Sequence, residues 1–285
     1  MLLDTKPKTF DELIRISGLS HGTDVWLGNA QSLIEAGTVT LDQAICCRDD
    51  IMIYLIKKGL EPNPAFKIME TVRKGKALKD PAKWAEYVKM MKEHDVPDWY
   101  IKSCEKIKYM FPKAHAAAYV TNAFRIAWFK VHKPLAYYAA YFSIRAKAFD
   151  SDVMICGKEK VKNKMKEIEL MGNTATAKDK DMYDDLEIVL EMYERGFKFL
   201  PIDLYESDSK KFLVQDDAIR PPLNSIPGLG GVAAESIIDA RRDGKFMSID
   251  DLKIRSRAGK SVIEMLTNAG CLQGMSQSNQ MSLFG

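Results

Sequence analysis

The chain has 285 residues, 46% of them hydrophobic and 28% charged, which is close to ordinary usage for soluble globular proteins. It contains no apolar run of the roughly 18 residues that a transmembrane helix needs, and its first residues lack the apolar stretch of a signal peptide. Length and composition therefore predict a cytoplasmic protein of about two domains with no membrane partner.

Cysteine spacing and net charge carry little specific information on function. The five cysteines include no Cys-x-x-Cys pair, which argues against a zinc site, and their odd number argues against a disulfide framework. Net charge is only +3, but residues 57–113 hold 14 Lys and Arg against 8 Asp and Glu. Two interpretations of this local excess remain open, a phosphate-binding patch and a solvated helical surface.

Apolar residues recur every three or four positions through the first 150 residues, a pattern typical of amphipathic helices. We expect helices over Thr9–Ser17, Val25–Ala36, Asp50–Lys58, Ala65–Val72 and Ala82–His94, and another beginning at Pro97. Pro112 precedes the longest apolar stretch, Ala114–Phe149. Pro134 divides this stretch into two expected helices, because proline cannot continue a helical hydrogen-bond ladder.

The pattern changes twice in the second half of the chain. Charged helices are expected over Val153–Leu170 and Lys178–Arg195, and short extended segments over Phe197–Arg220. Residues 226–274 return to a helical pattern, and the Ser/Gln/Asn-rich tail is expected to be disordered when free. The predicted fold class is mainly α, with a helical subdomain at 1–150, a connector of helices and short strands at 151–222, a helix-hairpin-helix module at 223–275 and a flexible tail at 276–285.

The run Phe111–Tyr119 carries the first candidate site. Pro112 favours a helix start, and His115 and Tyr119 lie four residues apart on one face with small alanines between them. Lys113 sits in the first turn, where the helix dipole already favours anions. A cation, an imidazole and an aromatic ring suit a triphosphate and its base or sugar. The alternative, that His115 and Tyr119 pack against neighbouring side chains, stays open on these residues alone.

An apolar-Pro-Gly-x-Gly turn at 226–230 runs directly into a helical pattern, which is typical of a helix-hairpin-helix. Glycine lets the backbone approach a phosphate closely, and the helix that follows directs its free N–H groups at the phosphate. Such contacts fix where the protein sits on the DNA backbone, and they do not distinguish one base sequence from another. A purely structural turn is the alternative. The expected DNA-binding residues are Pro227, Gly228, Leu229, Gly230 and Gly231.

A second, degenerate copy of the hairpin is expected downstream. Ser248 fits an N-cap, and Lys260–Ala269 fits the partner helix. Three basic residues lie in the connection, where a phosphate contact would be placed: Arg255, Arg257 and Lys260.

The end of the chain is suited to binding a partner protein. Gln280, Met281, Ser282, Leu283 and Phe284 place a glutamine and an apolar pair on a flexible polar tether. Such a peptide can insert Leu283 and Phe284 into a pocket on the partner. Because the tail must become ordered on binding, the contact is expected to be exchangeable.

At these residues the sequence resembles the C-terminal portion of the PolC-type DNA polymerase III alpha subunit, the replicative polymerase of low-GC Gram-positive bacteria and their relatives. The resemblance covers essentially the whole chain and consists of runs too long to be unspecific. These runs are Ser17–Asn29, Arg48–Met52, Ile68–Lys76, Lys106–Tyr119 and Ile226–Gly230.

The resemblance implies that residues 1–150 form the fingers, which close on the incoming dNTP. Lys113, His115 and Tyr119 would then lie at the triphosphate and the sugar. The further basic residues implied there are Arg73, Lys74 and Lys76. The helix-hairpin-helix would follow the minor-groove backbone of the primer–template duplex. The tail resembles the family's peptide for the beta sliding clamp, usually Gln-Leu-x-Leu-Phe, with Met281 in place of a leucine of similar size.

In this family the palm supplies paired aspartates that hold two Mg²⁺ ions for nucleotidyl transfer. This sequence has no Asp-x-Asp on a predicted strand, and Asp49–Asp50 and Asp250–Asp251 fall at helix starts, where acids complement the dipole. We therefore expect no catalytic residue and no metal ligand in this chain. DNA-directed DNA polymerase (nucleotidyltransferase) activity would belong to a longer protein with palm and thumb, and this part alone would be inactive.

A different class of function is also compatible with the hairpin and the tail. A freestanding DNA-binding adaptor could bring a sliding clamp to DNA without binding nucleotide. The hairpin and the tail support both hypotheses equally, and only the region Lys57–Tyr119 separates them.

Overall fold

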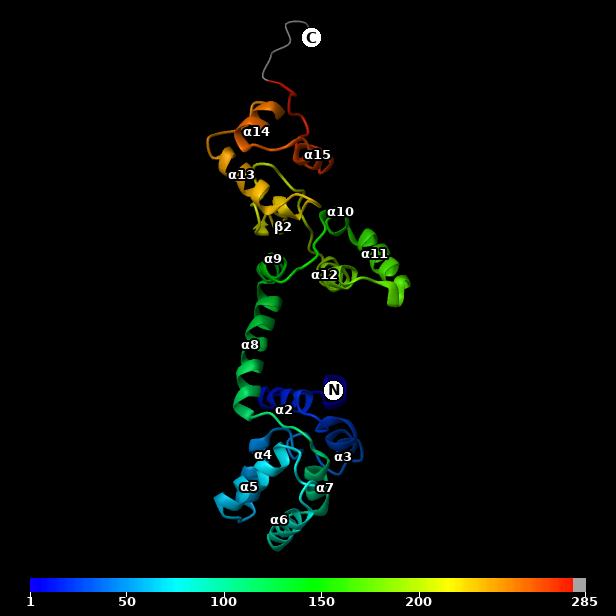
Figure 1. Ribbon diagram of the computed structural model, residues 1–285, viewed down its shortest axis with the longest axis vertical. Coiled ribbons are helices and arrows are strands. Elements are labelled where there is room, and N and C mark those ends of the chain that lie inside the picture. Colours follow the sequence, from blue (N-terminus) through cyan, green and yellow to red (C-terminus); the bar gives the residue numbers. More distant parts are fainter. Residues whose placement is uncertain (279–285) are drawn as a thin grey trace. The chain divides into compact units, whose positions relative to one another are not determined.

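The computed structural model describes residues 1–278, and in that range the chain is built of helices with one two-stranded sheet (Figure 1). This confirms the predicted fold class, mainly α. The chain divides into two compact units, Met1–Arg125 and Ile126–Gly285, so that the boundary lies within helix α8. None of the described helices is both long and apolar enough to span a bilayer.

The first unit contains the helices expected from the apolar periodicity. Their bounds are Phe10–His21 (α2), Gln31–Glu35 (α3), Arg48–Lys57 (α4), Pro62–Arg73 (α5), Pro81–Glu93 (α6), Asp98–Lys106 (α7) and Lys113–His132 (α8), of which only the part up to Arg125 belongs to this unit. The short helix Leu2–Thr5 (α1) was not predicted. The single helix expected over Val25–Ala36 is wrong in its first half. Leu27 is extended and Gly28 has a φ of 65°, so Trp26–Ala30 is an irregular turn and the regular helix begins only at Gln31.

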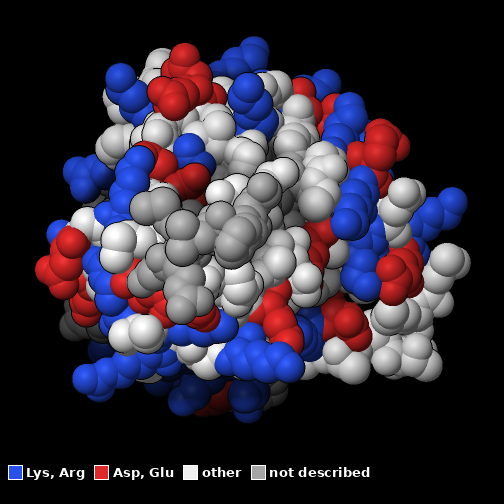
Figure 2. Space-filling model, turned by 90° about the horizontal axis from the view of Figure 1, so that it is seen from above, with Lys and Arg blue, Asp and Glu red and all other residues white. Residues whose placement is uncertain are grey.

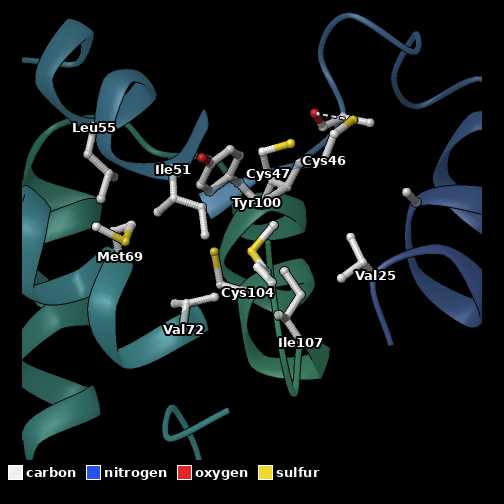
Figure 3. Packing of buried hydrophobic residues seen from close by; sticks show 14 of the residues in the cluster. Val25, Cys46, Cys47, Ile51, Leu55, Met69, Val72, Tyr100, Cys104 and Ile107 are labelled. Carbon is white, nitrogen blue, oxygen red and sulfur yellow. Dashed lines mark hydrogen bonds between the residues drawn. The ribbon is translucent and has the colours of Figure 1, made fainter. Parts of the chain in front are cut away.

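Helices α4, α5 and α7 enclose the apolar core of the first unit. Ile51 and Leu55 of α4 meet Met69 and Val72 of α5, and Cys104 of α7 lies among them (Figure 3). All five side chains are buried. Burial raises the pKa of the Cys104 thiol well above its usual value, so this side chain is a small neutral apolar group with little reactivity.

The segment 107–112, which joins α7 to α8, passes very close to the end of α2. The Thr23 N–H donates a hydrogen bond to the Tyr109 carbonyl at 2.9 Å, and the Lys108 N–H donates to the Thr23 carbonyl at 3.1 Å. A Cβ atom on Gly22 would lie 3.0 Å from the Tyr109 carbonyl oxygen. The backbones can therefore approach this closely because residue 22 is glycine.

The same segment passes the end of α5 on its other side. The Met110 N–H donates to the Arg73 carbonyl at 3.2 Å. Gly75 follows with a φ of +62°, and a Cβ atom there would lie only 2.5 Å from the Lys108 carbonyl oxygen. Glycine at position 75 thus meets two demands, a left-handed backbone and a close approach of two chains.

Helix α4 fixes the far end of this segment and the start of α8. The Arg48 N–H donates to the Phe111 carbonyl at 3.1 Å. The Lys113 N–H, which has no partner within its own helix, donates to the Asp49 carboxylate at 2.6 Å. These bonds set where α8 begins and so where its first turns lie.

The second unit starts with the end of α8 and continues with Pro134–Ile144 (α9), Ser151–Met154 (α10), Lys158–Met171 (α11) and Ala177–Glu194 (α12). Strands Leu213–Gln215 (β1) and Ala218–Arg220 (β2) pair antiparallel, with Val214 opposite Ile219. Of the expected extended region Phe197–Arg220, only this hairpin and a single bridge from Phe199 to Ile219 form ladder contacts in the described structure. Helices Gly231–Arg241 (α13), Ile249–Ser256 (α14) and Lys260–Asn268 (α15) complete the unit.

Two apolar clusters stabilise the second unit. The first is rich in aromatic rings from α9 and the following loops, with Tyr138 and Phe142 buried against Leu186 of α12. The second joins α13, α14 and α15 through Ile237, Leu252 and others, all of them buried. The helices that carry the predicted hairpins thus share one core of their own.

We predict that Gly75→Ala lowers the free energy of unfolding by roughly 2–4 kcal/mol, because it combines left-handed backbone strain with a clash at the Lys108 carbonyl. Gly37→Ala is the matched control, since Gly37 has a similar φ of +67° but nothing within 4 Å of the added Cβ. It should cost only about 1 kcal/mol. Denaturant unfolding measures both, and equal losses would contradict the close approach.

Candidate nucleotide and DNA interface

Aromatic rings line up along the segment before α8 and the first turns of that helix. The His115 ring lies between Phe111 and Tyr119, with centroid separations of 5.0 Å and 4.5 Å and interplanar angles of 29° and 41°. Tyr109 meets Phe111 edge-on at 5.3 Å. We call Tyr109, Phe111, His115 and Tyr119 the aromatic column. Tyr119, at its end, is 62% exposed and leaves a ring face available for stacking.

The structure brings His115 and Tyr119 together as the spacing predicted, but Lys113 lies elsewhere. Residues two apart on a helix do not share a face. The Lys113 ammonium pairs with Asp11 at 3.0 Å, and this hydrogen bond holds the pKa of the Asp11 carboxyl below its usual value. Lys113 and Arg15 both line a cavity of about 570 Å³.

The basic residues predicted near residue 75 are partly engaged within the protein. Arg73 and Lys74 both pair with Glu70, and these bonds, the one from Arg73 foremost, lower the pKa of the Glu70 carboxyl to about 2. Lys76 is exposed. Arg73 is nevertheless close to the aromatic column, because its carbonyl accepts the Met110 N–H at 3.2 Å. An arriving phosphate would have to compete with Glu70 for Arg73.

Two residues beside the aromatic column were not predicted from the sequence. The His21 ring meets Phe111 edge-on at 5.9 Å. Arg48 binds the Phe111 carbonyl through its backbone, and its buried Nε has no hydrogen-bond partner in the described part of the chain. The Asp49 carboxylate lies 3.9 Å from this Nε, so an anion reaching Arg48 would supply the hydrogen bond that Nε lacks but would have to compete with Asp49. His115 and Tyr119 were identified from their four-residue spacing on one helix. His21 and Arg48 have no such spacing to His115, so no signal in the sequence pointed to them.

The predicted hairpin has the geometry of an anion-binding turn. Gly228 has a φ of 84°, Leu229 is buried, and its N–H donates to the Ile226 carbonyl at 3.0 Å to close the turn. Gly230 is the N-cap of α13 in an extended conformation, so no side chain caps this helix, and its first turn holds no acidic residue. A Cβ at Gly230 would have nothing within 4 Å, which leaves the N–H groups of the first turn approachable.

The turn between α14 and α15 repeats this geometry. Arg257 takes the left-handed position with a φ of 55°, and Gly259 is an extended N-cap without a capping side chain or an acid in the first turn. Thr9, Thr176 and Ser248 cap their helices with a side chain, whereas α5, α7, α9 and α11 also begin without one. The two turns are therefore set apart by their shared backbone geometry and not by the missing cap alone. The second copy is therefore present, with the same two-residue spacing between the left-handed residue and the glycine N-cap.

The three basic residues of the second copy have different surroundings. Arg255 is directed inward: its guanidinium donates to the carbonyls of Ala240 and Gly244, pairs with Asp251 at 3.3 Å and lies over the Phe246 ring at 4.6 Å. It thereby ties α14 to the end of α13. Arg257 and Lys260 are exposed, and Lys260 is 3.9 Å from Glu264. Arg257 and Lys260 are thus accessible from solvent, whereas the contacts of Arg255 hold the fold together.

Lys210 is a further basic residue at the first hairpin that sequence reasoning missed. An added Cβ at Gly231 would lie 3.1 Å from the Lys210 Cε, and the Lys210 ammonium pairs with Glu235 at 2.6 Å. It comes from the irregular region before β1, so only the tertiary fold brings it to the start of α13.

Basic and acidic side chains are mixed on the face of the molecule that Figure 2 shows. Within residues 1–278, no group of three or more His, Cys, Asp and Glu side chains is placed to hold a metal ion. The predicted clamp peptide, Gln280–Phe284, lies outside the described residues.

Comparison with known proteins finds both regions in one family. The finger domain of the bacterial DNA polymerase III alpha subunit matches residues 1–95, and a helix-hairpin-helix motif matches residues 196–282. Proteins named DNA polymerase III PolC-type match the whole chain: at 57% identity in Oceanobacillus iheyensis, 56% in Caldanaerobacter subterraneus and 55% in Bacillus subtilis. The chain spans only 19–20% of the length of these relatives. The resemblance read from the sequence is thus confirmed.

Proposed function

The chain belongs, as a segment of about a fifth of their length, to the PolC-type DNA polymerase III proteins, and on that premise we propose that it binds duplex DNA and the incoming nucleotide for DNA synthesis. The observation that carries the proposal is the pair of like turns at 228–231 and 257–260, each opening a helix with no capping side chain. Free N–H groups at a helix start bind phosphate well and read no base sequence.

The first unit supplies the nucleotide-binding part of the proposal. Stacking between a base and an aromatic ring contributes roughly 1–3 kcal/mol, and the exposed Tyr119 at the end of the aromatic column offers such a ring. Arg48 and Arg73 provide positive charge beside the column for the phosphates. This arrangement favours a polymerase segment over a DNA-binding clamp adaptor, which would have no use for a nucleotide-stacking face.

We assign the polymerase chemistry to the full-length protein. The two Mg²⁺ ions of nucleotidyl transfer need closely placed carboxylates, and within residues 1–278 no three or more His, Cys, Asp or Glu side chains are placed to hold a metal ion. The metal ions would be held by the palm, and this chain would contribute binding and orientation. Its partners would then be primer–template DNA, incoming dNTP, the palm and thumb, and a beta sliding clamp at Gln280–Phe284.

Duplex binding is tested by Gly230→Val. Because nothing lies within 4 Å of the added Cβ and the backbone is ordinary, the variant should fold normally while its methyl groups obstruct the phosphate. We expect affinity for duplex DNA to fall by roughly ten-fold for any base sequence, as expected when a backbone contact is lost. Unchanged affinity in a fluorescence anisotropy titration would remove the hairpin from the DNA interface.

Nucleotide binding is tested by Tyr119→Ala in the full-length polymerase. Loss of stacking should raise the KM for dNTP roughly ten-fold with little change in KM for primer–template. Tyr119→Phe keeps the ring and should behave like the parent enzyme. Equal KM values for Tyr119→Ala and the parent would show that the column does not bind nucleotide.

Clamp binding is tested by deleting Gln280–Phe284. The truncated chain should no longer be retained on immobilised beta clamp, while its affinity for duplex DNA should be unchanged. Retention of the truncated chain would disprove the assignment of the tail.

A further inference from the structure

A cleft of about 400 Å³ opens beside the first hairpin, within the second unit. One wall is the hairpin itself, Ile226–Gly230. The other comes from the loop after α9 and from the first turns of α12, including Lys147, Phe149 and Lys178. We call this the connector cleft. Two lysines from a region outside the hairpin motif therefore face the turn that is proposed to bind phosphate.

Lys178 has no evident structural purpose. It is exposed in the first turn of α12, where the helix dipole disfavours a cation, and no ion pair within 4 Å is found for it among residues 1–278. The cap of this helix is already complete, since Thr176 and Asp179 form a capping box. A lysine in this position weakens the helix slightly unless an anion from outside neutralises it.

Lys147 is held near the cleft by neighbouring acids. Its ammonium pairs with Asp181 at 3.1 Å, and its backbone N–H donates to Asp185 at 3.0 Å. The side chain is 72% exposed, so exchange of Asp181 for a phosphate would cost little.

The acidic residues around the cleft are engaged by other groups. Asp150, which also lines it, accepts the Asp152 N–H at 2.9 Å, and Asp179 accepts the Thr176 N–H at 2.9 Å. Asp181 is the partner of Lys147. The Asp179 carboxylate also interacts electrostatically with Lys178, but Lys178 forms no ion pair within 4 Å among residues 1–278, so its ammonium can attract an anion into the cleft.

We propose that the connector cleft receives a backbone phosphate of the same DNA strand whose neighbouring phosphate lies on the first hairpin, with Lys178 as its contact and Lys147 as a second donor. This proposal rests on the proposed duplex binding by the hairpin. Lysine acts here as a point charge on a phosphodiester, so the contact adds affinity without base preference. Residues 147–182 thereby become part of the DNA-binding surface, beyond the helix-hairpin-helix motif.

The test is a salt titration of the 285-residue chain with two fluorescein-labelled duplexes of unrelated sequence. Lys178→Ala should weaken binding roughly five-fold at about 0.15 M KCl and reduce the slope of log K against log [KCl] by about 0.9. The double variant Lys147→Ala, Lys178→Ala should lose roughly 25-fold. Both duplexes should respond alike. Lys180→Ala is the matched control, since Lys180 is exposed on the same helix and does not line the cleft.

The outcomes separate this inference from the proposed function. If Lys178→Ala matches Lys180→Ala while Gly230→Val loses affinity, the cleft is not a phosphate site and the hairpin remains one. If Gly230→Val also keeps full affinity, duplex binding by the hairpin fails and the cleft proposal fails with it. If 10 mM inorganic phosphate lowers the DNA affinity of the parent chain and of Lys180→Ala toward that of Lys178→Ala, and changes Lys178→Ala much less, competition at the cleft itself is supported.

Discussion

The passage of residues 107–112 between Gly22 and Gly75 is the constraint on which the first unit depends. At Gly75 an added Cβ would clash with the Lys108 carbonyl oxygen at 2.5 Å, and at Gly22 it would clash with Val25 Cγ2 and lie 3.0 Å from the Tyr109 carbonyl oxygen, so both positions favour glycine. The same segment carries the first two rings of the aromatic column, and α4 then fixes the start of α8, which carries His115 and Tyr119. The backbone bonds of segment 107–112 therefore fix the position of the aromatic column, which is the proposed nucleotide-binding surface.

The second unit is proposed to bind its ligand through backbone N–H groups, whereas the first unit uses side-chain rings. These N–H groups must remain without a hydrogen-bond partner until DNA binds. Glycine in place of a capping side chain at these two helix starts forgoes only about a few tenths of a kcal/mol each. The shared core of α13, α14 and α15 and the inward guanidinium of Arg255, which binds the carbonyls of Ala240 and Gly244, offset that loss. Stability and binding are thus assigned to different residues within one small module.

The helices, the break between α8 and α9 and the first hairpin could be predicted from the sequence, because each depends on residues that are close together along the chain. Periodicity identified the helices, Pro134 marked the break between α8 and α9, and the glycine pattern at 226–230 identified the hairpin. What was missed depends on tertiary contacts. The turn at Gly28 interrupts a continuous apolar pattern, Arg255 is directed inward although its neighbour Arg257 is exposed, and Lys210 reaches α13 from a distant loop. Lys113 was grouped with His115 by proximity in sequence, whereas the helix places the two side chains on different faces.

The central claim, that paired uncapped helix starts hold the DNA backbone, is tested most directly by hydrogen exchange with and without a primer–template duplex. The account predicts slower exchange at the backbone N–H groups of residues 230–232 and 259–261, with the protection weakening as salt is raised. The capped start of α14, at residues 249–251, should exchange at the same rate in both states and serves as an internal reference. Exchange that is not slowed by the duplex at either of the two turns would contradict the account.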